Sequence, residues 1–176
     1  EAFGEDTYLT TQMVVNAVKG VQGDYEGLGN GTHIGAVTKH FAGYGQIKGG
    51  RNFASIDISE RTLIDEIFPP FEAAVKEART LGIMPSHGDL NGVASHGNPE
   101  LLTEILREDW GFDGYVVSDS NDIARLYYFM NVAESPEEAA IMGLKAGIDI
   151  DLYAEDSYAY LPEIVKENPE LEDLID

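Results

Sequence analysis

The chain has 176 residues, which is within the usual size of one domain and enough to bury a hydrophobic core. It carries 11 Lys and Arg against 32 Asp and Glu, a formal net charge of -21 at pH 7. Nucleic acid and anionic membranes would repel so acidic a surface, so neither is an expected partner, whereas a neutral sugar meets no such repulsion. The hydrophobic fraction of 43% is typical of a globular protein, and no apolar run approaches the roughly 20 residues of a bilayer-spanning helix.

The chain has no cysteine, which excludes a disulfide framework, a thiol nucleophile and a zinc–thiolate site. No metal and no other cofactor is expected. The sequence starts at Glu1 without an initiator methionine or a signal peptide. We therefore expect an internal piece of a longer protein, cut at both ends.

Helix signals recur along the chain. Apolar residues at helical spacing predict a helix over residues 9–22, and the next runs from Ser59 to about residue 79, broken or kinked at Pro69-Pro70. Asn98 is the predicted cap of a helix that starts at Pro99. Three further helix starts are predicted at Ser120-Asn121-Asp122, at Ser135-Pro136 and after Ser157.

Short apolar strands alternate with these helices. They are predicted at residues 34–41, 82–86, 115–117 and 148–152. This alternation indicates a parallel α/β fold. Four strand–helix units amount to half of an eightfold barrel or to most of a doubly wound sheet, and the pattern alone does not separate the two.

Polar residues follow each predicted strand, at the end where α/β folds bind ligands. They are Lys39 and His40, then Ser86, His87 and Asp89, then Ser118, Asp119 and Asp122, and finally Asp149 and Asp151. Because polar residues follow all four predicted strands, we expect a ligand-binding or catalytic site where these strand ends meet.

Each residue also has a structural interpretation. Asp119 could cap the following helix, although Ser120, Asn121 and Asp122 are all competent caps. Single histidines such as His40, His87 and His96 are more often structural, and solvated or loop-capping roles are expected for Asp149 and Asp151. The aromatic run at residues 127–129 is expected to pack in the core rather than to stack on a sugar.

Four segments resemble the catalytic barrel of glycoside hydrolase family 3. They are Glu1 to Leu9 (Glu-Ala-Phe-Gly-Glu-Asp-Thr-Tyr-Leu), Lys39-His40-Phe41, Leu106 to Asp119 with its Gly-Phe-Asp-Gly and Ser-Asp steps, and Ala146-Gly147-Ile148-Asp149. The resemblance covers nearly the whole length and is closest to the β-glucosidase and β-xylosidase branch. It implies a partial (β/α)8 TIM barrel of about four strand–helix units. The residues 1–176 would then be a fragment of one catalytic barrel domain, with the N-terminal part of the barrel and any C-terminal domain missing.

The resemblance also implies an activity and its residues. Asp119 would be the nucleophile of a retaining exo-β-glycosidase acting on β-glucosides or β-xylosides, and Lys39 and His40 would bind hydroxyls of the first sugar. Met84, His87 and Ser120 stand at the other substrate-binding positions, with His87 where the family often has Tyr and Ser120 where it often has Trp. The expected partners are a β-linked oligosaccharide or glycoside and the missing parts of the same chain. No Glu matches the family's general acid/base, which in the β-glucosidase branch lies in a later domain.

One branch of the family is not expected. Its N-acetylglucosaminidases carry Lys-His-Phe-Pro-Gly-His-Gly and a later Asp-Ser-His, whose Asp and His supply the acid and base. Here Tyr44 occupies the position of the second His, and no His follows His40 until His87.

Three alternatives remain open at this point. A Schiff-base lyase of the aldolase type could use Lys39 if burial kept its amine neutral. A metal-dependent hydrolase could use His40, His87, His96 and Asp119, although no familiar metal-binding spacing is present. The chain could also be a non-catalytic sugar-binding fragment.

Overall fold

The computed structural model describes residues 3–23, 28–29 and 31–175. Glu1 and Ala2, the first residues of the Glu-x-x-Gly-Glu-Asp segment, lie outside the described residues. The helices, of α, 3-10 and π type, are α1 (Thr7–Gln22), η2 (Tyr44–Gln46), η3 (Lys48–Gly50), α2 (Glu60–Thr62), η4 (Leu63–Ile67), α3 (Phe68–Lys76), η5 (Ser95–Gly97), η6 (Glu100–Asp109), α4 (Asp122–Tyr128), α5 (Pro136–Ala146), η7 (Ala154–Asp156), η8 (Tyr158–Tyr160), α6 (Leu161–Glu167) and η9 (Pro169–Leu174). The strands are β1 (Val37–Phe41), β2 (Gly82–Pro85), β3 (Asp89–Leu90), β4 (Val93–Ala94) and β5 (Tyr115–Val116).

A parallel sheet with the strand order β1-β2-β5 organises the chain. A parallel bridge between Val117 and Ile150 adds a fourth position beside β5. The neighbours follow the order of the sequence without a reversal, as in a (β/α)8 barrel, whereas a doubly wound sheet changes direction at its switch point. The four predicted strands are therefore found as a partial barrel, with β1 starting three residues later than predicted and the fourth reduced to a bridge.

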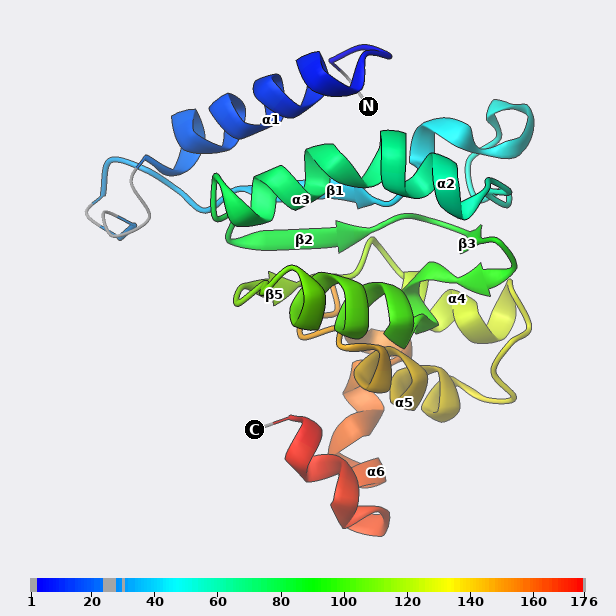
Figure 1. Cartoon of the computed structure of the whole chain (residues 1–176). Helices are drawn as coiled ribbons and strands as arrows, with labels where there is room; N and C mark the ends of the chain where they lie inside the picture. The colour runs from blue at the N-terminus through cyan, green and yellow to red at the C-terminus, as the bar shows by residue number, and fades with distance from the viewer. Residues whose placement is uncertain (1–2, 24–27, 30, 176) are drawn as a thin grey trace.

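Helices pack on one face of this sheet, with α1 against α3 at one end and α5 and α6 at the other (Figure 1). The α2–η4–α3 helix connects β1 to β2, and η6 connects the β3–β4 hairpin to β5. The predicted break at Pro69-Pro70 is a change of helix type, because η4 is a π-helix and the prolines lie in the first turn of α3. A first turn tolerates proline because its N–H groups have no intrahelical partner.

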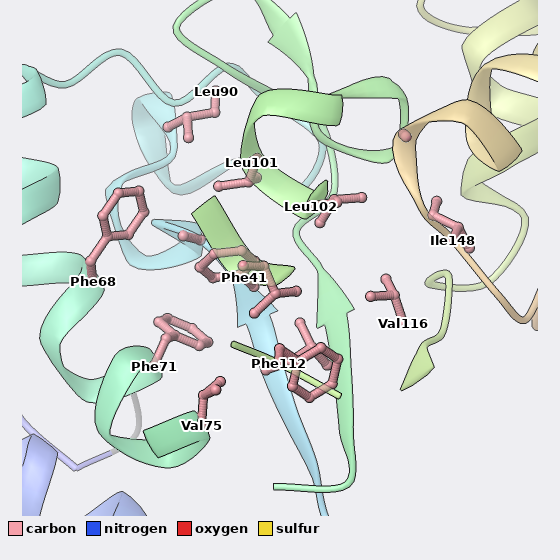
Figure 2. Close-up of a cluster of buried hydrophobic side chains, with 14 of the residues drawn as sticks. Phe41, Phe68, Phe71, Val75, Leu90, Leu101, Leu102, Phe112, Val116 and Ile148 are labelled. Carbon is pink, nitrogen blue, oxygen red and sulfur yellow. The ribbon is translucent and has the colours of Figure 1, made fainter. Parts of the chain in front are cut away.

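The hydrophobic core lies between the sheet and these helices (Figure 2). Phe41 of β1 is fully buried and packs its ring against Phe68, Phe71 and Trp110. The other most deeply buried members come from every strand position and from the covering helices, and include Ile83, Leu102, Val116, Ile123 and Ile148. The core thus fixes the sheet from its helix-covered face and leaves the strand ends free for a site.

Helix starts follow the sequence closely, with one exception. The Asn98 side chain accepts a hydrogen bond from the Leu101 N–H, and Ser135 accepts one from the Glu138 N–H, as predicted for caps. The predicted side-chain capping by Ser120-Asn121-Asp122 is wrong. Asn121 occupies the cap position in the left-handed region and makes no capping side-chain bond, while Asp122 turns inward and is buried.

A second prediction that is wrong concerns the aromatic run at residues 127–129. Tyr127, Tyr128 and Phe129 are all exposed, with Phe129 at 53% relative exposure. Helix α4 is short and ends at Tyr128, and its buried side is already occupied by Ile123, Ala124 and Leu126. The three aromatic residues therefore face away from the core.

Candidate active site

Three side chains meet at the carboxyl ends of neighbouring strands. His40 lies near the end of β1, His87 lies two residues beyond β2, and Asp119 lies three residues beyond β5. The pairing of β1 with β2 is irregular between Lys39 and Phe41, at His40. Such irregularities re-aim a side chain next to a site, and here the His40 imidazole is directed at Asp119.

The Asp119 carboxylate is held at both oxygens. Its Oδ2 lies 3.2 Å from His40 Nε2 and 3.0 Å from His87 Nε2. Its Oδ1 accepts a hydrogen bond of 2.7 Å from the Ser120 N–H. The side chain is 13% exposed, so the carboxylate is ordered but still reachable from solvent.

His87 connects Asp119 to a second, more deeply buried acid. His87 Nδ1 lies 2.5 Å from Asp122 Oδ2, and Asp122 is only 3% exposed. The other oxygen of Asp122 accepts a 2.5 Å hydrogen bond from Arg125, one turn further along α4. Burial alone would raise the pKa of Asp122, but hydrogen bonds from His87 and Arg125 and the proximity of His96 lower it overall. Asp122 is therefore held as the carboxylate.

His96 supports the same loop from beneath. Its Nε2 accepts a 2.9 Å hydrogen bond from the Asp119 N–H, so the ring proton is on Nδ1, which faces Asp122 Oδ2 at 3.5 Å. Complete burial lowers the pKa of His96 to about 4. His96 is thus neutral, and its structural role is to accept the hydrogen bond of the Asp119 backbone N–H.

Electrostatics also favour a neutral His40. Its partial burial, followed by the charge of the adjacent Lys39, lowers the pKa of His40, while Asp119 acts in the opposite direction. A neutral imidazole retains one N–H donor for the Asp119 carboxylate or for a sugar hydroxyl.

Aromatic rings line this cluster. Tyr44 lies 4.8 Å from His40, and Phe53 lies 4.4 Å from His87, as ring-centroid distances. The Arg125 guanidinium stacks on Phe53 at 4.4 Å, and the exposed Phe129 meets Phe53 edge-on at 5.9 Å. These rings cover one flank of His87 with apolar surface.

Asp149 and Asp151, at the fourth strand position, accept hydrogen bonds from neighbouring strands, helices and loops. Asp149 accepts hydrogen bonds from the Val116 N–H and from Arg107, both at 2.6 Å. Asp151 accepts from the Ser118 hydroxyl at 3.0 Å and from the Ser157 hydroxyl. Solvated or loop-capping roles are expected from the sequence for both acids: Asp151 bonds the loop residues Ser118 and Ser157, whereas Asp149 bonds the β5 backbone and Arg107.

The structure brings only part of the predicted site set together. Asp119, His40 and His87 are in direct contact, and Ser120 contributes its backbone while its side chain is exposed. Met84 is 8% exposed within β2, where it pairs in register with Lys39. Lys39 is exposed and lines a pocket together with His40 and with residues of α1 and α3, and no ion pair of Lys39 is found within the described residues.

Sequence reasoning missed how much of the site is built by Asp122, His96 and Arg125. The sequence places Asp122 among the strand-end polar residues and among the possible helix caps, and it favours a structural role for His96, with metal ligation as an alternative. The available signal was the Asp-x-x-Arg spacing from Asp122 to Arg125, which places an acid and a base one turn apart on a helix. Nothing in the sequence indicated that this pair turns toward the strand ends.

The described residues bear on two of the alternatives, the metal-dependent hydrolase and the Schiff-base lyase. Within residues 3–23, 28–29 and 31–175, no group of three or more His, Asp or Glu side chains is arranged to hold a metal ion. Among the described helices, none combines the length and the apolar character needed to cross a membrane. A Schiff-base lysine needs a desolvated amine, whereas Lys39 is exposed.

The structure is thus a partial (β/α)8 barrel with a candidate active site at its strand ends. The centre of this site is a carboxylate held by two histidines. The chain belongs to glycosyl hydrolase family 3: the model of the "Glycosyl hydrolase family 3 N terminal domain" matches residues 1–176. A protein of Formosa agariphila with a provisional β-xylosidase name is 85% identical over 176 residues, and a β-xylosidase of the same organism is 49% identical over 152 residues, or 86% of this chain. The chain spans less than a quarter of these relatives, 23% and 21% of their lengths.

Solved structures of β-glucosidases share this fold. A β-glucosidase from Erythrobacter marinus is 45% identical, with a TM-score of 0.90 over 94% of this chain and 22% of that chain. A β-glucosidase from Listeria innocua, solved in complex with glucose, is 29% identical, with a TM-score of 0.91 over 98% of this chain and 24% of that chain. The predicted fold class and family are confirmed.

Proposed function

We propose that the protein containing this chain is a retaining exo-β-glycosidase that hydrolyses O-glycosidic bonds of β-xylosides or β-glucosides through a glycosyl–Asp119 intermediate. The observation that carries the proposal is the Asp119 carboxylate, fixed at a barrel strand end by His40 and His87 in a chain of family 3. Retaining glycosidases need an ionised carboxylate held close to the anomeric carbon.

The geometry supports an assignment of the two carboxylate oxygens. Oδ2 accepts from two imidazoles, whereas Oδ1 accepts only the Ser120 N–H among the described residues, so Oδ1 keeps a lone pair for attack. Oδ1 bonds to the anomeric carbon as the bond to the leaving-group oxygen breaks. Water then cleaves the glycosyl ester, and the two inversions leave the sugar in its original configuration.

The leaving group needs a proton from a general acid, which in retaining enzymes lies about 5 to 5.5 Å from the nucleophile. Asp122 is buried and ion-paired, and Asp149 and Asp151 are occupied by backbone and side-chain donors, so none of these carboxyls is suited to the role. We assign the acid/base to a part of the protein outside this chain. Residues 1–176 would accordingly be a fragment of one catalytic barrel domain.

The first sugar would contact the residues around Asp119. His40, His87 and Ser120 surround the carboxylate, and Lys39 and Met84 are paired across the adjacent strands. The two Formosa relatives carry β-xylosidase names, which favours β-xylosides over β-glucosides as the better substrates.

Substitution of Asp119 tests the nucleophile in the full-length protein. Asp119→Asn should lower turnover of an aryl β-xyloside by several orders of magnitude, because a neutral amide is a poor nucleophile. Asp119→Gly with added azide should regain activity and release the α-glycosyl azide, since azide attacks once, from the face that Asp119 used. Asp113→Asn, an exposed acid paired with Arg79, is the matched control and should retain full activity. A β-glycosyl azide, or normal turnover by Asp119→Asn, would contradict the proposal.

A further inference from the structure

His87 lies between two carboxylates, and both of its ring nitrogens face an acid oxygen. Nε2 is 3.0 Å from Asp119 Oδ2 and Nδ1 is 2.5 Å from Asp122 Oδ2. The His87 side chain is 12% exposed, so water has little access to replace either partner. A neutral imidazole has one N–H and one lone pair, and a lone pair facing a carboxylate is repelled. Two ionised acids therefore require both His87 nitrogens to be protonated.

We propose that Asp122 is a positioning residue that holds His87 as the imidazolium, and that this cation keeps the Asp119 carboxylate ionised and oriented for attack on the sugar. This inference rests on the proposed function and adds a second acid, which does not touch substrate, to the apparatus of the nucleophile.

The charges around His87 support this assignment. Arg125 balances one unit of negative charge at Asp122, and an imidazolium at His87 balances the charge of Asp119. The other titratable rings near His87 are His40 at 5.9 Å and Tyr44 at 6.2 Å between centroids, and His96 beneath the loop is neutral. Lys39 is exposed and acts on His40 instead. Among the described side chains, His87 is thus the group placed to supply the missing positive charge.

The environment of Asp122 suits it to this role. Its hydrogen bonds to Arg125 and His87, together with the nearby His96, lower its pKa against the opposing effect of burial. Phe53 covers the outer face of His87 at 4.4 Å and in turn carries the Arg125 guanidinium. The pair is therefore shielded from solvent, where electrostatic attraction is strongest.

The pH dependence of kcat/KM is the readout that separates positioning from mere structural support. With a 2,4-dinitrophenyl β-xyloside, whose leaving group needs no acid, the acidic limb reports ionisation of the free nucleophile. In the full-length enzyme, Asp122→Asn should lower kcat/KM by about 10- to 100-fold, as expected for loss of a charge-assisted interaction. The acidic limb should also move to higher pH by about one unit or more, because Asp119 loses a neighbouring cation.

A double-mutant comparison completes the test. His87→Gln removes the same positive charge and should give the same shift, and adding Asp122→Asn to His87→Gln should shift the limb no further. Asp113→Asn controls for a general change in net charge. If Asp122→Asn does not fold, His87→Gln alone must still move the limb.

Two results would overturn the inference. One is an unchanged acidic limb in folded Asp122→Asn or His87→Gln, and the other is fully additive shifts in the double variant. Failure of the proposed function looks different, because wild-type enzyme would then form no covalent sugar adduct at Asp119 at all.

Discussion

At the scale of single residues, the site is a set of hydrogen bonds that distinguishes the two oxygens of one carboxylate. Asp119 Oδ2 is shared by His40 and His87, and Oδ1 receives the N–H of Ser120. The backbone N–H of Asp119 itself is anchored on His96. Each anchor removes a degree of freedom from the carboxylate, which is what the proposed attack on a sugar would require.

The burial of His96 predicts an acid-sensitive site. The pKa of this histidine is lowered to about 4, against about 6.5 in an unfolded chain. Between these two values the unfolded chain binds a proton that the folded protein does not, so the free energy of unfolding falls as pH falls from about 6.5 to 4. The full effect is about 3 kcal/mol. Asp122, whose pKa is also lowered, adds a loss in the same direction below about pH 3.8.

Hydrogen-exchange mass spectrometry on peptides covering residues 82–96 measures this loss as a decrease in the free energy of opening between pH 7 and pH 4.5. His96→Gln retains an acceptor for the Asp119 N–H without a titrating ring, and should flatten the dependence. An unaltered pH dependence in His96→Gln would show that another group is responsible.

At the scale of elements, the loop after β1 decides which branch of the family the site resembles. The segment with η2 and η3 carries Tyr44 where the N-acetylglucosaminidases have a second histidine. Tyr44 packs on His40 and donates a hydrogen bond of 2.8 Å to Asn52. The Tyr44 ring therefore supports His40 and departs from the Lys-His-Phe-Pro-Gly-His-Gly pattern of that branch.

This loop predicts substrate preference. The full-length enzyme should cleave an aryl β-xyloside or β-glucoside efficiently and an aryl N-acetyl-β-glucosaminide poorly. Steady-state kcat/KM values for the three aryl glycosides provide the comparison. A higher kcat/KM for the N-acetylglucosaminide would contradict this predicted preference.

Strand and helix positions were predictable because they depend on local patterns. The cap at Ser135 and the buried strand at residues 115–117 need only neighbouring residues to be recognised. The site was only partly predictable, since Asp122 and Asp119 are three residues apart and both have the sequence context of a helix cap. Which of the two carboxylates is accessible to solvent depends on the hydrogen bonds of His87 and His96. These histidines lie just beyond β2 and in η5, so only the packing of distant segments brings them to Asp122 and Asp119.

At the scale of the whole molecule, the sheet is an open segment of a barrel. Val37 of β1 and Ile150 at the opposite edge are exposed, as are Leu9 and Met13 of α1. A closed barrel would cover such strand edges and apolar residues. Helices α1 and α6 lie on opposite sides of the strands (Figure 1).

Residues 1–176 alone should have no appreciable glycosidase activity. The strand edges are unpaired, and general acid catalysis, which contributes about 10² to 10⁴-fold, would be missing. Circular dichroism during urea unfolding tests for a cooperative fold, and assays with aryl β-xyloside and β-glucoside run beside the full-length enzyme test activity. Comparable rates from the two proteins would place the acid/base within this chain.

The nucleophile is tested most directly by trapping it. The full-length enzyme is incubated with a 2-deoxy-2-fluoro β-glycoside bearing a good leaving group, and its peptides are analysed by mass spectrometry. The fluorine slows hydrolysis of the intermediate, so the sugar should accumulate as an ester on Asp119, and Asp119→Asn should remain unlabelled. A label on Asp122, on Asp149 or on any other residue would contradict the assignment on which the account of this site depends.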